Sequence, residues 1–292
     1  MPAFSVIIPT YNRAAVLPKA VRSVLAQDFE DLEVIVVDDG SSDETADVIR
    51  TLDDDRVRYV RRENGGLSRA RNTGTERAEG RYLAFLDDDD EALPGWLGSF
   101  DQAFGSHDYA VVCCGAEMID DRGAVLEVLL PDDLGAMLDR QVGLFMAGTF
   151  ALRREVFEAS GGFTPDLQSS HATDLAFRLV PMCVARGWRI GSIRQPLVRI
   201  WLGDGRRRAR DGARRRLEGT THLLATYGDR LQRSPRTLAE YLAVAGVSAA
   251  RLGHFATARR FFARSLRAYP RQPKNLGRLL VSMAPPVARK VW

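Results

Sequence analysis

Short apolar runs and longer amphipathic segments alternate through the first hundred residues of the chain. The apolar runs cover residues 4–8, 32–37, 57–60 and 82–86. Runs of this kind, bounded by polar residues and Pro, predict strands that are buried on both faces. Residues 15–27 instead carry their apolar side chains on a helical period. Strand and helix alternating at this spacing predict right-handed βαβ units, and therefore an α/β fold with a parallel sheet.

Polar residues follow directly on three of these predicted strands. Tyr11 and Asn12 follow the first strand, Asp38 and Asp39 follow the second, and four consecutive aspartates at 87–90 follow the last. The carboxyl ends of parallel strands lie at the same edge of a sheet, and ligands of open α/β sheets bind there. We therefore expect these residues to converge.

The aspartate run at 87–90 predicts a cation, because adjacent carboxylates repel one another unless solvent or a metal separates them. Mg²⁺ and Mn²⁺ take oxygen ligands and are commonly shared between one or two carboxylates and the phosphates of a substrate. The run therefore predicts a metal–diphosphate site, with a solvated acidic turn as the alternative. A Gly-rich turn at 64–74 leads into a helix that carries Arg71, an arrangement that suits a phosphate. Neither GxGxxG nor GxxxxGK(S/T) occurs in the chain.

The composition indicates an ordinary globular protein of 292 residues, of which 45% are hydrophobic. The net charge is only +3, but acids crowd the first half and arginines crowd the stretch after Arg206, which hints at a basic contact surface. Cys113, Cys114 and Cys183 have neither a disulfide nor a zinc spacing. The start does not resemble a signal peptide and no apolar run approaches 18 residues, so we expect a cytoplasmic protein.

Four motifs in the first hundred residues resemble those of the family 2 inverting glycosyltransferases with the GT-A fold. The motifs are Val6-Ile7-Ile8-Pro9-Thr10-Tyr11-Asn12-Arg13, Val36-Val37-Asp38-Asp39-Gly40-Ser41-Ser42-Asp43, Asn64-Gly65-Gly66 with Ala70-Arg71-Asn72, and Phe85-Leu86-Asp87-Asp88-Asp89-Asp90 with Pro94. Each is common alone, and their order and spacing carry the resemblance. It implies a GT-A type, mostly parallel twisted sheet flanked by helices, in a domain at 1–205. Residues 1–100 would form its nucleotide-sugar half and 101–205 its acceptor half.

The resemblance also implies roles for individual residues. The implied nucleotide-sugar-binding residues are Pro9, Tyr11, Asp39, Arg71, Asp87 and Asp88. Tyr11 would stack on the nucleobase, Asp39 would accept a hydrogen bond from it, and Arg71 would steady the donor. Asp88 would face the donor sugar or ribose, and Asp89 would bind the metal, Mn or Mg. A core Tyr, a strand-end acid and a surface Arg are the alternative interpretations of Tyr11, Asp39 and Arg71.

The predicted acceptor half departs from the family at its general base. Residues 146–154 and the turn Gly161-Gly162-Phe163 resemble the family's acceptor side, but Ala172 occupies the position where the family has its catalytic Asp. His171 and Asp174 are the candidate replacements, since both can share one helix face, and we slightly favour Asp174. The alternatives are an ion pair between Asp174 and Arg178, and a surface or capping role for His171.

The remaining chain, 206–292, predicts an Arg-rich segment followed by a C-terminal α-helical extension. The segment from Arg206 to Arg216 would neutralise a diphosphate or contact anionic lipid at the inner membrane face, or form an exposed basic helix. Without interleaved aromatic residues, we do not expect nucleic acid as a partner. Residues 238–270 resemble one tetratricopeptide-type hairpin, which would pack on the transferase domain or form a homo-oligomer.

Taken together, these patterns predict a metal-dependent glycosyltransferase. It would move a sugar from a UDP-type or dTDP-type donor, with inversion, to a hydroxyl of a saccharide, lipid-linked or small-molecule acceptor. The alternative is a nucleotide-sugar-binding protein without turnover that acts as a scaffold or binds a partner. A nucleotidyltransferase is disfavoured because no Gly-rich, Lys-containing loop follows the first strand.

Overall fold

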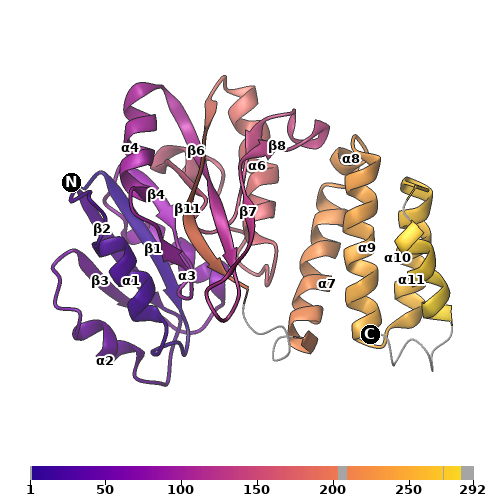
Figure 1. The fold of residues 1–292 in the computed structure, drawn as a ribbon, viewed down its shortest axis with the longest axis horizontal. Coiled ribbons are helices and arrows are strands. Elements are labelled where there is room, and N and C mark those ends of the chain that lie inside the picture. Colours follow the sequence, from indigo (N-terminus) through magenta and orange to yellow (C-terminus); the bar gives the residue numbers. More distant parts are fainter. Residues whose placement is uncertain (1, 203–208, 272, 284–292) are drawn as a thin grey trace. The chain divides into compact units, whose positions relative to one another are not determined.

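The computed structural model describes residues 2–202, 209–271 and 273–283 (Figure 1). The chain divides into two compact units. The first unit comprises Met1–Leu134, Asp139–Asp166 and Ala172–Gly203. The second comprises Gly135–Leu138, Leu167–His171 and Asp204–Trp292. The predicted domain limits, 1–205 and 206–292, remain a prediction.

The first unit is built on a nine-stranded, mostly parallel sheet of order β3-β2-β1-β4-β10-β6-β11-β5, with β7 paired to β6. The parallel strands are β1 (Phe4–Thr10), β2 (Leu32–Asp38), β3 (Val57–Arg61), β4 (Tyr82–Phe85), β6 (Tyr109–Ile119) and β11 (Arg189–Trp201). The antiparallel strands are β5 (Glu91–Ala92), β7 (Val125–Leu129) and β10 (Phe150–Arg153), the last lying between β4 and β6. A separate ladder joins β8 (Asp132–Asp133) and β9 (Val142–Gly143).

Helices cover both faces of this sheet, which explains why every residue of β1 and β2 is buried (Figure 1). The helices of this unit are α1 (Leu17–Leu25), α2 (Thr45–Arg50), α3 (Leu67–Arg77), α4 (Trp96–Ser106), α5 (Arg154–Ala159) and α6 (His171–Ala185). The apolar side chains of α1 and α4 pack with Val6, Ile8 and Val34 in one core. On the opposite face, α3 approaches β1 so closely that a Cβ at Gly74 would lie 2.5 Å from Ile7 Cγ2. Glycine is required there for the close packing of helix on strand.

The second unit is helical. Its helices are α7 (Ala209–Thr226), α8 (Gly228–Leu231), α9 (Pro235–Arg251), α10 (Phe255–Ala268) and α11 (Pro273–Met283), together with a 3₁₀ turn at Ala136–Leu138. α9 and α10 form an antiparallel pair: Ser265 Oγ donates to the carbonyl of Ala239 at 2.7 Å, and a Cβ at Gly246 would meet the ring of Phe262 at 2.6 Å. A tetratricopeptide identity for this pair remains a prediction. Within the described ranges, no helix is long and apolar enough to cross a bilayer.

The predicted Arg-rich segment is described only in part. Arg214, Arg215 and Arg216 are exposed on α7. The earlier arginines of the segment lie outside the residues whose side chains are described.

Candidate functional site

The carboxyl ends of β1, β2 and β4 lie side by side and bring the predicted polar residues together. Thr10 pairs with Asp38 in register, and the N–H of Asp39 donates to the carbonyl of Thr10 at 2.9 Å. On the other side of β1, Thr10 Oγ1 donates to Asp88 Oδ2 at 2.8 Å. The strand-end site, as we call this edge with its three loops, is therefore formed by side chains that are far apart in sequence.

The loop after β1 is tied to the loop after β2 and presents an aromatic ring to solvent. The N–H of Asn12 donates to Ser41 Oγ at 2.8 Å, and Asn12 Oδ1 accepts from the N–H of Ser42 at 2.8 Å. Asn12 has φ of 52°, a left-handed conformation that Asn tolerates better than most residues. Next to it, Tyr11 is 50% exposed, so its ring is available to stack on a flat ligand. Pro9 is buried within β1.

Asp39 holds the Gly-rich turn that starts α3. Its carboxylate accepts hydrogen bonds from the N–H of Gly65 at 3.1 Å, from the N–H of Gly66 at 2.7 Å and from the Arg62 guanidinium. The side chain of Asp39 is buried, and Gly66 begins α3 with φ of 90°. The N–H of Gly65 also lies 3.2 Å from the second oxygen, so each carboxylate oxygen of Asp39 already faces two donors. A hydrogen bond from a ligand would therefore have to share or replace one of these contacts.

The four aspartates after β4 have four different environments. Asp87 accepts from Arg71, Asp88 from Thr10, and Asp89 Oδ2 from Arg13 Nη1 at 2.9 Å. Asp90 is buried and accepts from the N–H of Trp201 at 3.0 Å, which ties the acidic loop to β11. Sequence reasoning did not single out Arg13, although its place in the first motif is a signal that could have found it.

Burial governs the protonation of the acidic run. The pKa of Asp88 is raised to about 7, chiefly by burial and also by the neighbouring charges of Asp89 and Asp87, while the hydrogen bond from Thr10 and the charge of Arg13 act in the opposite direction. Burial and the charge of Asp87 likewise raise the pKa of Asp90 well above its usual value. The positively charged side chains nearby therefore balance only part of the negative charge of these aspartates.

The residues at this site suit a cation whose coordination shell is completed by a bound ligand, rather than a cation whose ligands all come from the protein. In the described part of the chain, no group of three or more His, Cys, Asp or Glu side chains is placed to hold a metal. Mg²⁺ and Mn²⁺ do not need such a cage, because one or two carboxylates together with phosphate oxygens and water satisfy them. Two carboxylates of the run remain accessible: the side chain of Asp87 is 35% exposed beside Arg71, and that of Asp89 is 22% exposed beside Arg13.

α3 connects the strand-end site to the turn at Gly161 and Gly162. Arg71 is 4% exposed, binds Asp87 and lies over the ring of Phe163, with 5.1 Å from its guanidinium carbon to the ring centroid. The next residue, Asn72, donates to the carbonyl of Phe163 at 2.8 Å and accepts from its N–H at 2.9 Å. Arg71 is therefore buried rather than on the helix surface, and Asn72 is a second residue that sequence reasoning did not assign.

The candidate bases lie at the start of α6. Asp174 is 1% exposed and accepts from Thr164 Oγ1 at 2.7 Å and from Arg178 Nη2 at 2.9 Å. Arg178 also donates to the carbonyl of Ser160 at 2.6 Å. Asp174 thus takes part in a buried ion pair, as its alternative interpretation expected, whereas His171 is partly buried. The identity of the base remains a prediction.

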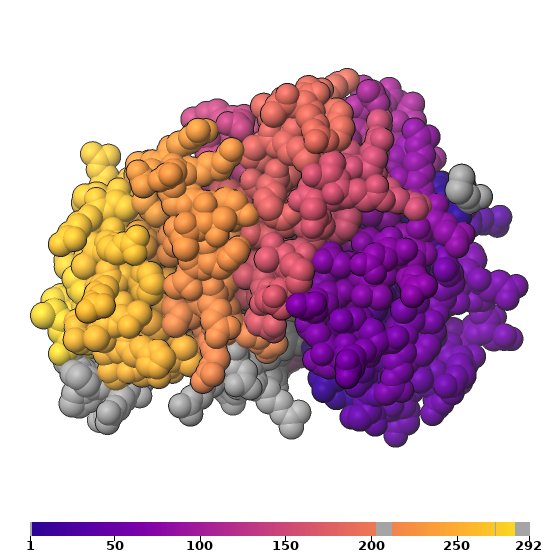
Figure 2. All heavy atoms as spheres, turned by 180° about the vertical axis from the view of Figure 1, so that it is seen from behind, coloured from indigo at the N-terminus to yellow at the C-terminus, as the bar shows by residue number. Residues whose placement is uncertain are grey.

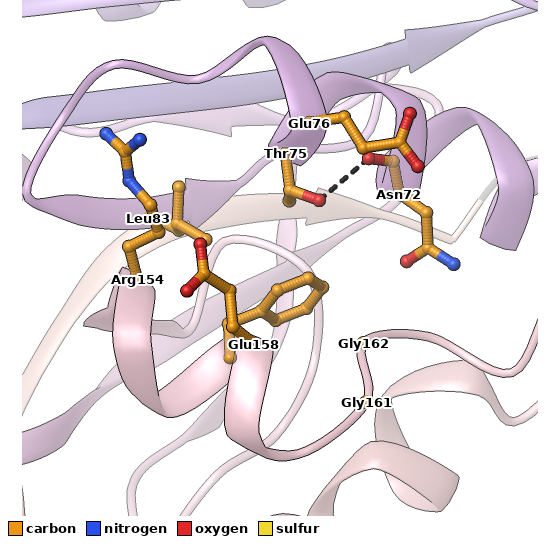
Figure 3. A pocket seen from close by; sticks show the side chains of 9 residues that line it. Asn72, Thr75, Glu76, Leu83, Arg154, Glu158, Gly161 and Gly162 are labelled. Carbon is orange, nitrogen blue, oxygen red and sulfur yellow. Dashed lines mark hydrogen bonds between the residues drawn. The ribbon is translucent and has the colours of Figure 1, made fainter.

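A cavity of about 390 Å³ lies beside the link between α3 and the glycine turn (Figure 3). It is lined by Asn72, Thr75, Glu76, Leu83, Arg154, Phe157, Glu158, Gly161 and Gly162. Asn72, Thr75 and Glu76 come from α3 and the two glycines from the turn, and none of the predicted donor-binding residues lines the cavity.

The strand-end site gathers acids, an exposed aromatic ring and the start of a Gly-capped helix. This arrangement is typical of open α/β proteins that bind a ligand at the carboxyl ends of their strands. Within that class, the chain belongs to the glycosyl transferase family 2, because the family model matches residues 5–161. The family resemblance read from the four motifs is thereby confirmed.

Two relatives illustrate the match. A GalNAc(5)-diNAcBac-PP-undecaprenol beta-1,3-glucosyltransferase of Campylobacter jejuni is 48% identical over 106 residues, which are 35% of this chain and 34% of that protein. An uncharacterized glycosyltransferase of Rickettsia prowazekii is 32% identical over 186 residues, 61% of this chain and 58% of the relative. The aligned regions thus span less than two thirds of the length of either relative.

Two solved structures share the fold. Staphylococcus aureus TarS in complex with UDP-GlcNAc aligns with a TM-score of 0.59 and 17% identity, over 92% of this chain and 89% of that one. A mannosyltransferase of Pyrobaculum calidifontis in complex with GDP-Man and Mn²⁺ aligns with a TM-score of 0.60 and 19% identity, over 99% and 86% of the two chains. These similarities confirm the predicted fold class, an α/β sheet of the GT-A type with C-terminal helices.

Proposed function

We propose that the protein is a glycosyltransferase that moves a sugar from a nucleoside diphosphate donor to a hydroxyl group of an acceptor, with inversion at the anomeric carbon. The observation that carries this proposal is the strand-end site, where Tyr11, Asp39 and Asp87 to Asp89 come from three adjacent parallel strands of a family 2 chain. A nucleobase, a diphosphate and a sugar need such a row of stacking, hydrogen-bonding and charged groups.

Each residue has a distinct task in this proposal. Tyr11 stacks on the base and Asp39 accepts a hydrogen bond from it, which suits UDP or dTDP. Arg71, positioned by Phe163 and Asp87, steadies the donor, and Asp88 faces its sugar or ribose. Asp89 would hold Mn²⁺ or Mg²⁺, which would neutralise charge developing on the departing diphosphate. Arg13 donates a hydrogen bond to Asp89 and balances the negative charge of that carboxylate. Its guanidinium would contribute a second positive charge in addition to the metal.

Inversion requires a base on the face of the sugar opposite the leaving group. Ala172 cannot accept a proton, so Asp174 or His171 would take this part. If Asp174 does so, its ion pair with Arg178 must open, because a carboxylate that is 1% exposed cannot meet an acceptor hydroxyl.

A lipid-linked saccharide is the acceptor that one relative favours. The name of the Campylobacter jejuni relative specifies an undecaprenol-linked glycan, and that protein is 48% identical over the aligned residues. A free saccharide or a small molecule remains an alternative acceptor. We expect the protein to work in the cytoplasm, and an undecaprenol-linked acceptor would bring it to the inner face of the membrane.

A nucleotide-sugar-binding protein without turnover is the second candidate, and one observation favours it. Ala172 stands at the family's base position and Asp174 is held in a buried ion pair, so no described acid of this helix is poised as a base. The strand-end site would then serve recognition alone.

Product analysis separates the candidates. The protein is incubated with UDP-sugars and dTDP-sugars, Mn²⁺ and an acceptor mixture that includes undecaprenyl diphosphate-linked glycans. Sugar transfer releases nucleoside diphosphate in an amount equal to the glycosylated product. Binding of donor without such release supports the second candidate. Release of pyrophosphate in a parallel incubation with a nucleoside triphosphate and a sugar 1-phosphate contradicts both.

A further inference from the structure

The chain after Glu240 contains cations but no acid, because no Asp or Glu follows that residue. The cations that lie on described residues there are Arg251, Arg259, Arg260, Arg264, Arg267, Arg271, Lys274 and Arg278. In the sheet-containing unit, by contrast, arginines are commonly paired with acids, as Arg58 is with Glu33 and Arg153 with Asp108. The described helices α10 and α11 therefore carry positive charge and no acid of their own.

Most of these cations face solvent. Arg260, Arg264 and Arg267 are exposed along α10, and Arg271 and Lys274 are exposed at the start of α11. None of these five forms an ion pair within the described ranges, whereas Arg259 is turned inward to the carbonyl of Ser282 at 3.1 Å. The exposed guanidinium groups are thus available to external anions. These helices form the yellow part of the surface in Figure 2.

An apolar stripe accompanies the charge on α11. Leu276, Leu280 and Met283 recur at helical spacing and are 51%, 58% and 62% exposed. Another side of α11, about 100° around the helix, is anchored, because Asn275 is buried and donates to Ser265 Oγ at 2.9 Å, and Ser282 is also buried. This anchoring fixes the rotation of α11 and keeps the stripe exposed. A helix with an apolar stripe, set in a strongly basic surface, has the character of an interfacial helix.

We propose that the surface of α10 and α11 docks on an anionic phospholipid bilayer. The three apolar side chains of α11 would enter the boundary between headgroups and acyl chains, and the arginines of α10 would bind lipid phosphates. This surface is distinct from the predicted contact through Arg206 to Arg216, and the proposal does not depend on the transfer reaction.

The surface of α10 and α11 is both positively charged and apolar, and these two features together favour an anionic bilayer as the partner. A second copy that docked symmetrically through the same face would oppose one Arg-rich surface with another, which is unfavourable. A nucleic acid would use the cations but leave Leu276, Leu280 and Met283 in water. An anionic bilayer satisfies both features of the surface.

Sedimentation of the full chain with vesicles tests the proposal. Vesicles of phosphatidylcholine alone are compared with vesicles that also contain phosphatidylglycerol, at low and high salt. We expect binding that requires phosphatidylglycerol and weakens with salt. The triple change Arg260→Gln, Arg264→Gln and Arg267→Gln should weaken it by roughly a hundredfold, since each cation near an anionic bilayer contributes about a fivefold change. Leu276→Ser with Leu280→Ser should weaken it by about tenfold.

The control variant is Val125→Ser with Leu126→Ser, which removes two exposed apolar side chains of β7, 50% and 60% exposed, from the other unit. It should bind vesicles as the unchanged protein does, and thermal unfolding should show that all variants are folded. The proposal is overturned if binding does not need phosphatidylglycerol, or if the α10 and α11 variants bind as well as the control. It is also overturned if the protein ignores vesicles and instead self-associates through Leu276 and Leu280 or binds a polynucleotide.

Discussion

Tyr11 is the residue through which the base would be recognised by shape. Its ring is half exposed, yet the loop that carries it is held by the paired hydrogen bonds of Asn12 to Ser41 and Ser42. An exposed aromatic side chain on an ordered loop loses little conformational freedom when a base stacks on it.

We expect Tyr11→Ala to weaken UDP binding by about 1–3 kcal/mol, the usual contribution of base–aromatic stacking. Tyr11→Phe is the matched control, because it keeps the ring and removes only the hydroxyl, and it should bind nearly as well as the native chain. Titration calorimetry with UDP measures both. Equal affinity in all three proteins would place the nucleobase elsewhere.

Asp174 and His171 are the two candidates for the base of the reaction, and they are separable by experiment. In Asp174→Asn or His171→Gln, loss of the true base should slow transfer by about 10²–10⁴ with donor affinity retained. If Asp174 has only a structural role, we expect a different pattern of effects on rate and stability.

Arg178→Gln distinguishes the two roles of Asp174, because it breaks the same ion pair without touching the carboxylate. If the ion pair is only structural, Asp174→Asn and Arg178→Gln should lower thermal stability to a similar degree. The transfer rate of either folded variant should then be the same as that of the native chain. If neither Asp174→Asn nor His171→Gln slows transfer even tenfold, the base comes from another segment.

At the scale of elements, α3 organises the site. It begins at the Gly66 turn held by Asp39, presents Arg71 to Asp87, and fixes Phe163 through Asn72. Its close approach to the sheet depends on Gly74, over which Ile7 and Val37 pack.

Gly74→Ala should therefore destabilise the protein by about 1–3 kcal/mol, because an added methyl group overpacks the contact with β1. Gly98→Ala in α4 is the matched control, since a Cβ there meets nothing within 4 Å and Ala favours the helix. It should leave stability unchanged or raise it by up to about 1 kcal/mol. Urea unfolding measures both variants, and equal stabilities would contradict the packing argument.

The strands that the apolar runs predicted are present together with their polar ends, because each run is apolar enough to be buried in a parallel sheet that helices cover on both faces. β10 lies antiparallel between β4 and β6, and this was not predictable, because its pairing partners are distant in sequence and its four residues carry no distinguishing period. Arg13, which binds Asp89, and Asn72, which binds the backbone of Phe163, were also missed. The hydrogen-bond partners of these two polar side chains are distant in sequence, so only the fold brings them together.

At the scale of the whole molecule, the amino ends of the strands contribute stability that depends on pH. Glu33, at the start of β2, is buried. Burial alone would raise its pKa, but hydrogen bonds from Ser5, the Glu79 N–H and Arg58 outweigh burial, and the pKa lies below its ordinary value of 4.5. Because the folded pKa is the lower one, Glu33 stabilises the folded chain above pH 4.5, and this contribution is lost as the pH falls through the folded value.

Glu33→Gln should lower the free energy of unfolding at neutral pH by about 1–3 kcal/mol, because charge-assisted hydrogen bonds are lost. The difference from the native chain should shrink as the pH is taken below 4.5. Glu79→Gln, which changes an exposed partner of the same Arg58, should have a much smaller effect. A Glu33→Gln deficit that does not depend on pH would contradict this account.

The central claim is that the acids after β4 hold a cation on a nucleoside diphosphate, and calorimetric titration of UDP with and without Mn²⁺ tests it most directly. The account predicts that Mn²⁺ strengthens UDP binding to the native chain and to Asp101→Ala, an exposed acid of α4, and that Asp89→Ala abolishes the Mn²⁺ effect while the protein remains folded. Equal Mn²⁺-dependent affinity for UDP in Asp89→Ala and in the native chain would contradict it.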